Sequence, residues 1–113
     1  MMTENAKYTY IDTHAHVYDE AFSGEEDEIV KKSREAGVRL IIQPDIDLKE
    51  RGKMFDLYRR HPDFFRNMVG LYPGSVDEDW EKDVADAESH ARDAGVVAIG
   101  EIGLDYYWVK DEE

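Results

Sequence analysis

The chain has no cysteine, and this absence removes two classes of structure. Neither a disulfide framework nor a thiolate metal site is possible, so any bound metal must be held by histidines and carboxylates. Long apolar runs are also missing: no stretch approaches the roughly 20 apolar residues of a membrane span, and residues 1–7 lack the apolar region of a signal peptide. We therefore expect neither membrane insertion nor secretion, and a cytoplasmic location fits best.

Positive charge is scarce, because 14 basic residues stand against 27 acidic residues and the formal net charge is −13. This excess repels polyanions at long range and argues against nucleic-acid binding through a basic surface. Much of the acidity lies at expected helix starts, where it is favourable, and at the end of the chain. With 42% hydrophobic and 12% aromatic residues, the 113 residues suffice for one ordinary globular core.

Four apolar runs rich in β-branched residues predict buried strands, at residues 8–17, 38–44, 67–72 and 96–102. The segments between them have helical spacing, and we expect helices at about 25–36, 49–61 and 80–94. Trp80 begins the apolar stripe of the last helix, so we expect it in the core. The order β-α-β-α-β-α-β predicts an α/β fold with a parallel sheet and right-handed crossovers.

Short polar and glycine motifs mark the expected helix boundaries. Three pairs have capping-box spacing before a helical segment: Ser23 with Glu26, Asp47 with Glu50, and Ser75 with Glu78. Gly37 and Gly95 each follow an Arg-x-Ala sequence, and both should adopt the left-handed conformation that ends a helix. His61 precedes Pro62 and should end the middle helix, because a residue before proline is disfavoured in the helical region.

Two architectures fit this order: a small doubly wound sheet, and a parallel (β/α) barrel of TIM type, which typically takes about 250 residues. The chain can supply only part of such a barrel, about its first four β/α units. In that case the strands should be ordered 1-2-3-4 without reversal. A doubly wound nucleotide-binding domain is disfavoured, because residues 13–18 stand where a glycine-rich phosphate loop would follow the first strand. We assign residues 1–7 to a polar lead and 8–113 to a partial barrel domain.

The first candidate site is Asp12-Thr13-His14-Ala15-His16, at the expected end of the first strand. Side chains at i and i+2 point to the same face of a strand, so the two imidazoles should meet at one site. Neutral imidazole is a good ligand for divalent transition metals, and Asp12 has the same parity and could orient one ring. Two unrelated surface histidines are the alternative interpretation.

Glu101 is the second candidate, a carboxylate between two glycines in an otherwise apolar run. An unpaired carboxylate in a buried sheet is costly, so Glu101 should be protonated, paired with a cation or bound to a metal. Gly100 and Gly103 allow close approach of a ligand or a backbone, which favours the metal interpretation. A glutamate exposed at a strand end is the alternative. Asp105 could be a helper, a turn former or a solvated side chain.

Together these motifs resemble the TatD family of metal-dependent hydrolases. Residues 11–16 are similar to the family's I-D-x-H-x-H signature, and residues 98–107 to its fourth-strand signature nearly residue for residue. The resemblance covers the chain from about residue 10 onward. It implies the N-terminal half of a (β/α) barrel hydrolase that cleaves phosphodiester bonds, most often described as a 3′ to 5′ deoxyribonuclease.

The resemblance also implies roles for single residues. His14 and His16 would bind one divalent ion, and Glu101 would bridge two ions or bind a second one, as the expected catalytic residue. The ions would be one or two of zinc, manganese or magnesium, and the substrate DNA or another phosphodiester. Tyr72 stands where the family commonly has His; a phenol can donate to a phosphate oxygen but cannot act as an imidazole. With Asp12 and Asp105 it is expected to support the site or contact substrate.

The family's remaining ligands, two His and an Asp, come from strands beyond the fourth, so this chain would carry only part of the active site. The alternative function is a non-catalytic barrel fragment that binds metal weakly. Its open sheet edges and uncovered inner face lead us to expect self-association or a missing C-terminal partner segment. His61 and His90 are given no catalytic role. Residues 106–108, three aromatics, could line a cleft or pack in an interface.

Overall fold

The structure, a computed structural model, describes residues 8–107; the expected polar lead at 1–7 and Trp108 lie outside the described residues. The strands are β1 (Tyr10–Asp12), β2 (Val38–Gln43), β3 (Phe65–Val69) and β4 (Val96–Ile99). The helices are α1 (Glu26–Glu35), α2 (Leu48–Arg60) and α3 (Trp80–His90). Two short 3₁₀ turns, η1 (Glu20–Phe22) and η2 (Pro73–Ser75), precede α1 and α3. Within residues 8–107, no helix has the length and apolar character needed to cross a membrane.

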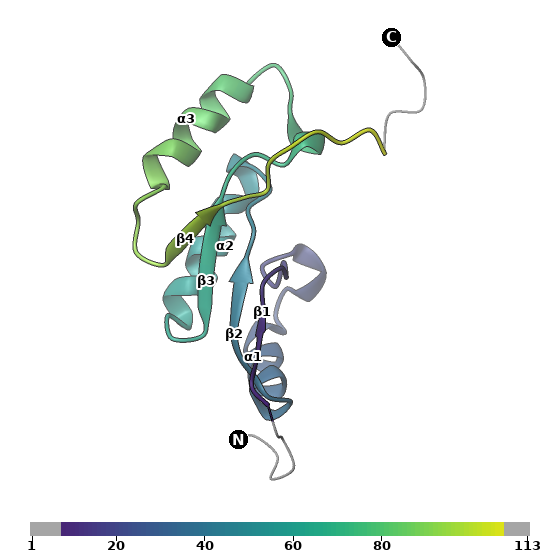
Figure 1. The fold of residues 1–113 in the computed structure, drawn as a ribbon, viewed down its shortest axis with the longest axis vertical. Coiled ribbons are helices and arrows are strands. Elements are labelled where there is room, and N and C mark those ends of the chain that lie inside the picture. Colours follow the sequence, from purple (N-terminus) through teal and green to yellow (C-terminus); the bar gives the residue numbers. More distant parts are fainter. Residues whose placement is uncertain (1–7, 108–113) are drawn as a thin grey trace.

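The sheet confirms the predicted topology. Its four strands are all parallel and lie in the order β1-β2-β3-β4. A doubly wound sheet would reverse its strand order part-way across, and this sheet does not. Figure 1 shows α1 and α2 behind the sheet and α3 beside β4. The arrangement is that of successive strand–helix units of a parallel barrel.

The helices cover one face of the sheet and form the core with it. Along β3, Phe65, Asn67 and Val69 are buried and the residues between them are half-buried. Because successive side chains of a strand point to opposite faces, this alternation means that one face is covered and the other is more open. Burying a large apolar side chain stabilises the fold by roughly 1.5–3 kcal/mol. The buried apolar residues are Val17, Tyr18, Val30, Ile41, Met54, Phe55, Leu57, Phe64, Phe65, Val69 and Ala87.

The first and last strands are much shorter than predicted. β1 ends at Asp12 and β4 at Ile99, so both histidines and Glu101 lie on loops beyond their strands. β3 covers 65–69 instead of 67–72. The apolar run after β1 stays packed, as at Val17, which is 5% exposed, but Ile102 after β4 is 66% exposed. β1 and most of β4 are exposed, so the prediction that these two strands are buried is wrong, because they are the edge strands of the sheet.

Only one of the three capping boxes is confirmed. The Asp47 side chain accepts a hydrogen bond from the Glu50 amide at 3.1 Å at the start of α2. α1 and α3 begin without a side-chain cap hydrogen bond, so the other two predictions are wrong. The physical reason is that Ser23 directly follows η1 and Ser75 is the last residue of η2, which places both serines in separate turns before the helices.

The predicted helix ends are confirmed at two positions and displaced at a third. His61 is the C-cap of α2, and Gly37, at φ 101°, follows the C-cap of α1. Gly95 also has a positive φ, 86°, but α3 already ends at His90. Gly95 therefore serves the turn into β4 and does not end the helix.

Trp80 is 48% exposed, so the prediction that it belongs to the core is wrong. With Val84 and Ile99 it lines an apolar groove of about 530 Å³ between α3 and the end of β4. Ala87 is the residue of α3 that is buried, so the helix turns much of its apolar stripe toward this groove. Exposed apolar surface is thus present at the β4 side of the sheet, while self-association stays a prediction.

Replacing Asp47 with alanine should lower the free energy of unfolding by about 0.5–2 kcal/mol, because α2 loses its N-cap acceptor. Ser23→Ala and Ser75→Ala are matched controls with the same sequence signature, and both should leave stability nearly unchanged. Urea denaturation of the full chain followed by circular dichroism measures all three. Equal losses in the three variants would contradict the assignment of the cap to Asp47 alone.

Candidate metal centre

Two loops at the carboxyl edge of the sheet bring three side chains of metal-ligand type together. His14 and His16 follow β1, and Glu101 follows β4. Oε2 of Glu101 lies 2.9 Å from Nε2 of His16 and 3.4 Å from Nε2 of His14. In the described part of the chain these residues form the one group that offers three ligand atoms within 4.8 Å of one another. The structure therefore brings together the three residues that the sequence placed in one site.

His16 is held on the side away from Glu101. Its Nδ1 lies 3.1 Å from the hydroxyl of Tyr18, which donates to the carbonyl oxygen of Pro44 at 2.6 Å. Burial, and after it the negative charge of nearby carboxylates such as Asp45, raises the pKa of the Tyr18 phenol well above its usual range, so the hydroxyl stays protonated. Nε2 of His16 is consequently the nitrogen that faces Glu101.

Glu101 reaches the histidines because the chain after β4 crosses the carboxyl end of β3, as Figure 1 shows. The amide of Gly100 donates to Val69 at 2.9 Å, and its carbonyl accepts from the amide of Asp45 at 3.2 Å. The Glu101 amide donates to the carbonyl of Asp45, also at 3.2 Å. A Cβ on Gly70 would lie 2.8 Å from the carbonyl oxygen of Glu101, so glycine at 70 permits the crossing.

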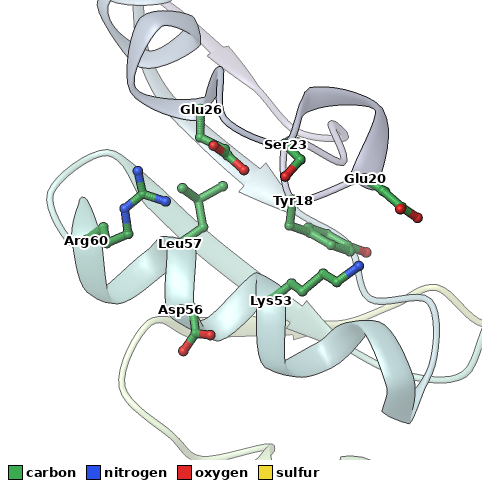
Figure 2. Close-up of a pocket in the computed structure, with 8 residues that line it drawn as sticks. All are labelled: Tyr18, Glu20, Ser23, Glu26, Lys53, Asp56, Leu57 and Arg60. Carbon is green, nitrogen blue, oxygen red and sulfur yellow. The ribbon is translucent and has the colours of Figure 1, made fainter.

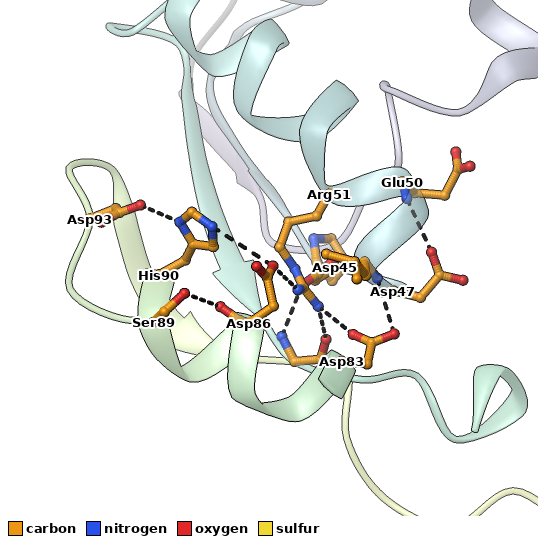
Figure 3. Close-up of polar contacts among 12 residues, drawn as sticks. Asp45, Asp47, Glu50, Arg51, Asp83, Asp86, Ser89, His90 and Asp93 are labelled. Carbon is orange, nitrogen blue, oxygen red and sulfur yellow. Dashed lines mark hydrogen bonds and ion pairs between the residues drawn. The ribbon is translucent and has the colours of Figure 1, made fainter. Parts of the chain in front are cut away.

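Asp45 is itself held by a buried cation (Figure 3). Arg51 is 2% exposed, and its Nε donates to Oδ2 of Asp45 at 2.6 Å. Its Nη1 donates to Asp86 at 2.6 Å, and its Nη2 to Asp83 and to the carbonyl of Gly70, both at 3.0 Å. The amide of Gly70 also donates to Oδ2 of Asp45, at 3.1 Å. We call Arg51, Asp45, Asp83 and Asp86 the Arg51 cluster.

The two most buried charges of the Arg51 cluster have shifted pKa values. Burial raises the pKa of Asp45 to about 6, against hydrogen bonds from Arg51 and Gly70 that favour the ionised form. For Arg51, burial is the largest influence and lowers the pKa, but the hydrogen bonds and charges of its carboxylate partners together raise it. At pH 7 the guanidinium is therefore charged, and Asp45 is mostly ionised.

The remaining predicted site residues make other contacts. Oδ1 of Asp12 accepts from the backbone amide of His14 at 3.0 Å, so this hydrogen bond holds the loop and not an imidazole ring. Tyr72 donates from its hydroxyl to Asp105 at 3.0 Å, which joins two of the candidate residues. His61 and His90, given no catalytic role, pair with Asp27 and Asp93 at 2.7 and 2.6 Å on the helical side of the fold.

Four residues that position the site were not identified from the sequence: Tyr18, Asp45, Arg51 and Gly70. A signal existed for Arg51, because it shares the i, i+3, i+4 stripe of α2 with Met54 and Phe55 and so places a cation on an apolar face. Tyr18 continues the two-residue spacing of the histidines. Asp45 and Gly70 have no local signature, because their partners are distant in sequence.

A sequence model of the family described as TatD related DNase matches residues 11–113. The chain belongs to this TatD-related DNase family. Over 116 residues the TatD-related chain is 29% identical to the uncharacterized metal-dependent hydrolase YjjV of Escherichia coli K12, covering 92% of this chain and 44% of YjjV. Over 85 residues it is 34% identical to the 3′-5′ ssDNA/RNA exonuclease TatD of Edwardsiella piscicida, covering 75% of this chain and 33% of that protein.

The solved structure of E. coli YjjV confirms the fold. It matches the TatD-related chain with a TM-score of 0.75 at 31% identity, over 88% of this chain and 39% of YjjV. The chain therefore spans less than half the length of these relatives. Its parallel sheet and alternating helices are those of part of a TIM barrel.

Arg51→Met should lower the free energy of unfolding by about 3–5 kcal/mol, because it leaves buried Asp45 without its compensating charge. Arg59→Met is the matched control on the same helix; it removes an exposed ion pair with Asp56 and should cost less than about 1 kcal/mol. Chemical denaturation monitored by circular dichroism compares the two. Similar losses in both variants would show that the buried cation is not a principal support of this fold.

Gly70→Ala and Gly52→Ala should change stability in opposite directions. At position 70 the added methyl group meets the backbone of residues 100–101 and should cost about 1–3 kcal/mol. At position 52 on α2 the methyl group meets nothing within 4 Å, and the better helix propensity of alanine should add up to about 1 kcal/mol. Thermal unfolding of both variants tests the assignment, and stabilisation by Gly70→Ala would refute the close crossing.

Proposed function

We propose that His14, His16 and Glu101 hold a divalent metal ion and form part of a catalytic centre that hydrolyses phosphodiester bonds in nucleic acid. The observation that carries this proposal is the close approach of three donor atoms from loops that follow the two edge strands, β1 and β4. Oε2 of Glu101 lies 2.9 Å from Nε2 of His16 and 3.4 Å from Nε2 of His14. Membership of the TatD-related DNase family supports the reaction class. The named activity of the Edwardsiella relative, a 3′-5′ exonuclease on ssDNA and RNA, is the substrate class we propose.

The donor set fits a divalent ion without large movement. Ligand atoms at about 2.0–2.1 Å from a tetrahedral ion lie about 3.3 Å from one another, close to the histidine–glutamate separations in this structure. Two imidazoles and one carboxylate suit zinc or manganese, and the carboxylate also suits magnesium. A bound ion would supply Lewis-acid polarisation of the phosphate and an activated water.

Tyr72 and Asp105 are proposed to contact substrate beside the metal position. Tyr72 follows β3, Asp105 follows β4, and a hydrogen bond of 3.0 Å joins them at the same edge of the sheet from which Glu101 comes. A phenol has one proton to donate, so a phosphate oxygen would replace Asp105 as its acceptor. Tyr106 is 76% exposed on the same loop, and exposed aromatic rings provide stacking surfaces for unpaired bases. A cytoplasmic location belongs to this same proposal.

A second candidate is a metal-binding barrel segment that does not catalyse hydrolysis by itself. One observation favours it: between residues 8 and 107, no other cluster of three or more histidines and carboxylates has the spacing of metal ligands, and this cluster offers three donors. Two-metal phosphodiesterases hold two ions about 3.5–4 Å apart, and such a site needs more donors than these. A further chain segment or a partner chain would then complete the site.

The metal proposal predicts a selective loss of affinity. His16→Ala and Glu101→Gln should weaken Mn²⁺ or Zn²⁺ binding at least about 10- to 100-fold, because even the loss of a hydrogen-bond partner of a metal ligand typically has that effect. His90→Ala and His61→Ala are controls, because these imidazoles pair with carboxylates on the helical side. Isothermal titration calorimetry of the full chain measures the affinities, and equal affinity in all variants would contradict the proposed site.

The same preparations distinguish the two candidate functions. Hydrolysis of single-stranded DNA with added Mn²⁺ is followed together with the oligomeric state by light scattering. We expect metal binding with little turnover by the monomer. A monodisperse monomer that cleaves DNA at about 1 per second or faster would eliminate the second candidate.

A further inference from the structure

We infer that Tyr18 is a positioning residue that holds a proton on Nδ1 of His16, so that Nε2 is the nitrogen left for a metal ion. The consequence for metal binding rests on the proposed function. The position of the Nδ1 proton follows from contacts among Tyr18, His16 and Pro44.

The direction of two hydrogen bonds decides whether Nδ1 of His16 carries a proton. A tyrosine hydroxyl has one proton to donate, and a backbone carbonyl can only accept. The Tyr18 hydroxyl lies 2.6 Å from the carbonyl oxygen of Pro44, so its proton is used there. The same oxygen lies 3.1 Å from Nδ1 of His16 and has only lone pairs left on that side. The imidazole must therefore donate from Nδ1, which places a proton on that nitrogen. In the metal-free chain Nε2 faces Oε2 of Glu101 at 2.9 Å, and a second proton, on Nε2 or on the carboxylate, completes that hydrogen bond.

The hydroxyl cannot readily turn to another partner. Tyr18 is 3% exposed, and its ring lines a pocket beside Leu57 and Lys53 of α2 (Figure 2). The ring also packs edge-on against the imidazole of His16, with centroids 5.6 Å apart. Pro44 is itself buried, and the next residue is Asp45 of the Arg51 cluster. Both the donor and the acceptor of this hydrogen bond are thus fixed by packing.

This arrangement has a consequence for ligand binding. A solvated neutral imidazole exchanges between two tautomers, and only one of them offers Nε2 as a metal ligand. A hydrogen bond at the opposite nitrogen keeps a proton there and fixes the ring orientation before the ion arrives, and loss of such a partner typically weakens metal binding 10- to 100-fold. His14 is more exposed, with 58% of its side chain accessible, so His16 is the better-ordered of the two imidazoles.

Tyr18→Phe tests the inference, because it keeps the ring in the core and removes only the hydroxyl. Tyr58→Phe is the matched control: Tyr58 is also packed against the core, on α2, and lies outside the contacts of His16. In the full chain without metal, two-bond ¹H–¹⁵N correlation spectra report which imidazole nitrogen carries the proton. We expect a proton on Nδ1 of His16 in the unmodified chain and in Tyr58→Phe. In Tyr18→Phe the Nδ1 proton should be largely lost, because Glu101 at Nε2 then favours the Nε2–H form.

Calorimetry with Zn²⁺ gives the second readout. Affinity should fall about 10- to 100-fold in Tyr18→Phe and stay unchanged in Tyr58→Phe. An Nδ1 without a proton on His16 in the unmodified, metal-free chain would overturn the inference without any variant, so a misfolded Tyr18→Phe does not remove the test. Loss of the Nδ1 proton with unchanged affinity would overturn the positioning role. If His16→Ala also leaves Zn²⁺ affinity unchanged, the proposed metal function fails, while the Nδ1–H signal still supports the contact with Tyr18.

Discussion

The buried guanidinium of Arg51 is the interaction on which the candidate site depends. Taking a charge out of water costs several kcal/mol, and the cost is offset only when good hydrogen-bond geometry and opposite charges surround it. Three carboxylates and the carbonyl of Gly70 meet this condition at 2.6–3.0 Å. They come from the segment after β2, from α3 and from the end of β3. One cation on α2 therefore fixes the relative positions of elements that share no continuous stretch of chain.

The two residues after β2, Pro44 and Asp45, connect the Arg51 cluster to the candidate metal site. The carbonyl of Pro44 accepts from Tyr18, which contacts His16, and the carbonyl of Asp45 accepts from the amide of Glu101. An imidazole from the first strand's loop and a carboxylate from the fourth strand's loop are thus positioned by adjacent peptide groups. Because Arg51 holds the Asp45 side chain, loss of the Arg51 cluster would displace both His16 and Glu101.

Most of the fold was predictable from local pattern, and the support of the site was not. Apolar periodicity and the glycine at 37 identified the elements and their order, and the resemblance in residues 11–16 and 98–107 identified the three residues that converge. The Tyr18–Pro44 and Asp45–Gly70 hydrogen bonds join residues 26 and 25 positions apart. No spacing rule describes such contacts, because they depend on how the strands end. The same limit explains Ser23 and Ser75, which have the right spacing for caps but lie at separate turns.

The charge of the Arg51 cluster bears on how this acidic chain could accept a phosphodiester. Three carboxylates against one guanidinium give the Arg51 cluster a formal charge of −2, and its Asp45 is joined to Glu101 by a backbone hydrogen bond. The whole chain carries a formal charge of −13. Without an ion, a phosphate near His14 and His16 would meet a repulsive field. A divalent cation is often the largest local charge in such a site and reverses its sign. On the proposed function, the carboxylates that build the site therefore also make substrate binding depend on a bound metal ion. The phosphate would then be attracted only at the position of that ion, where hydrolysis would occur.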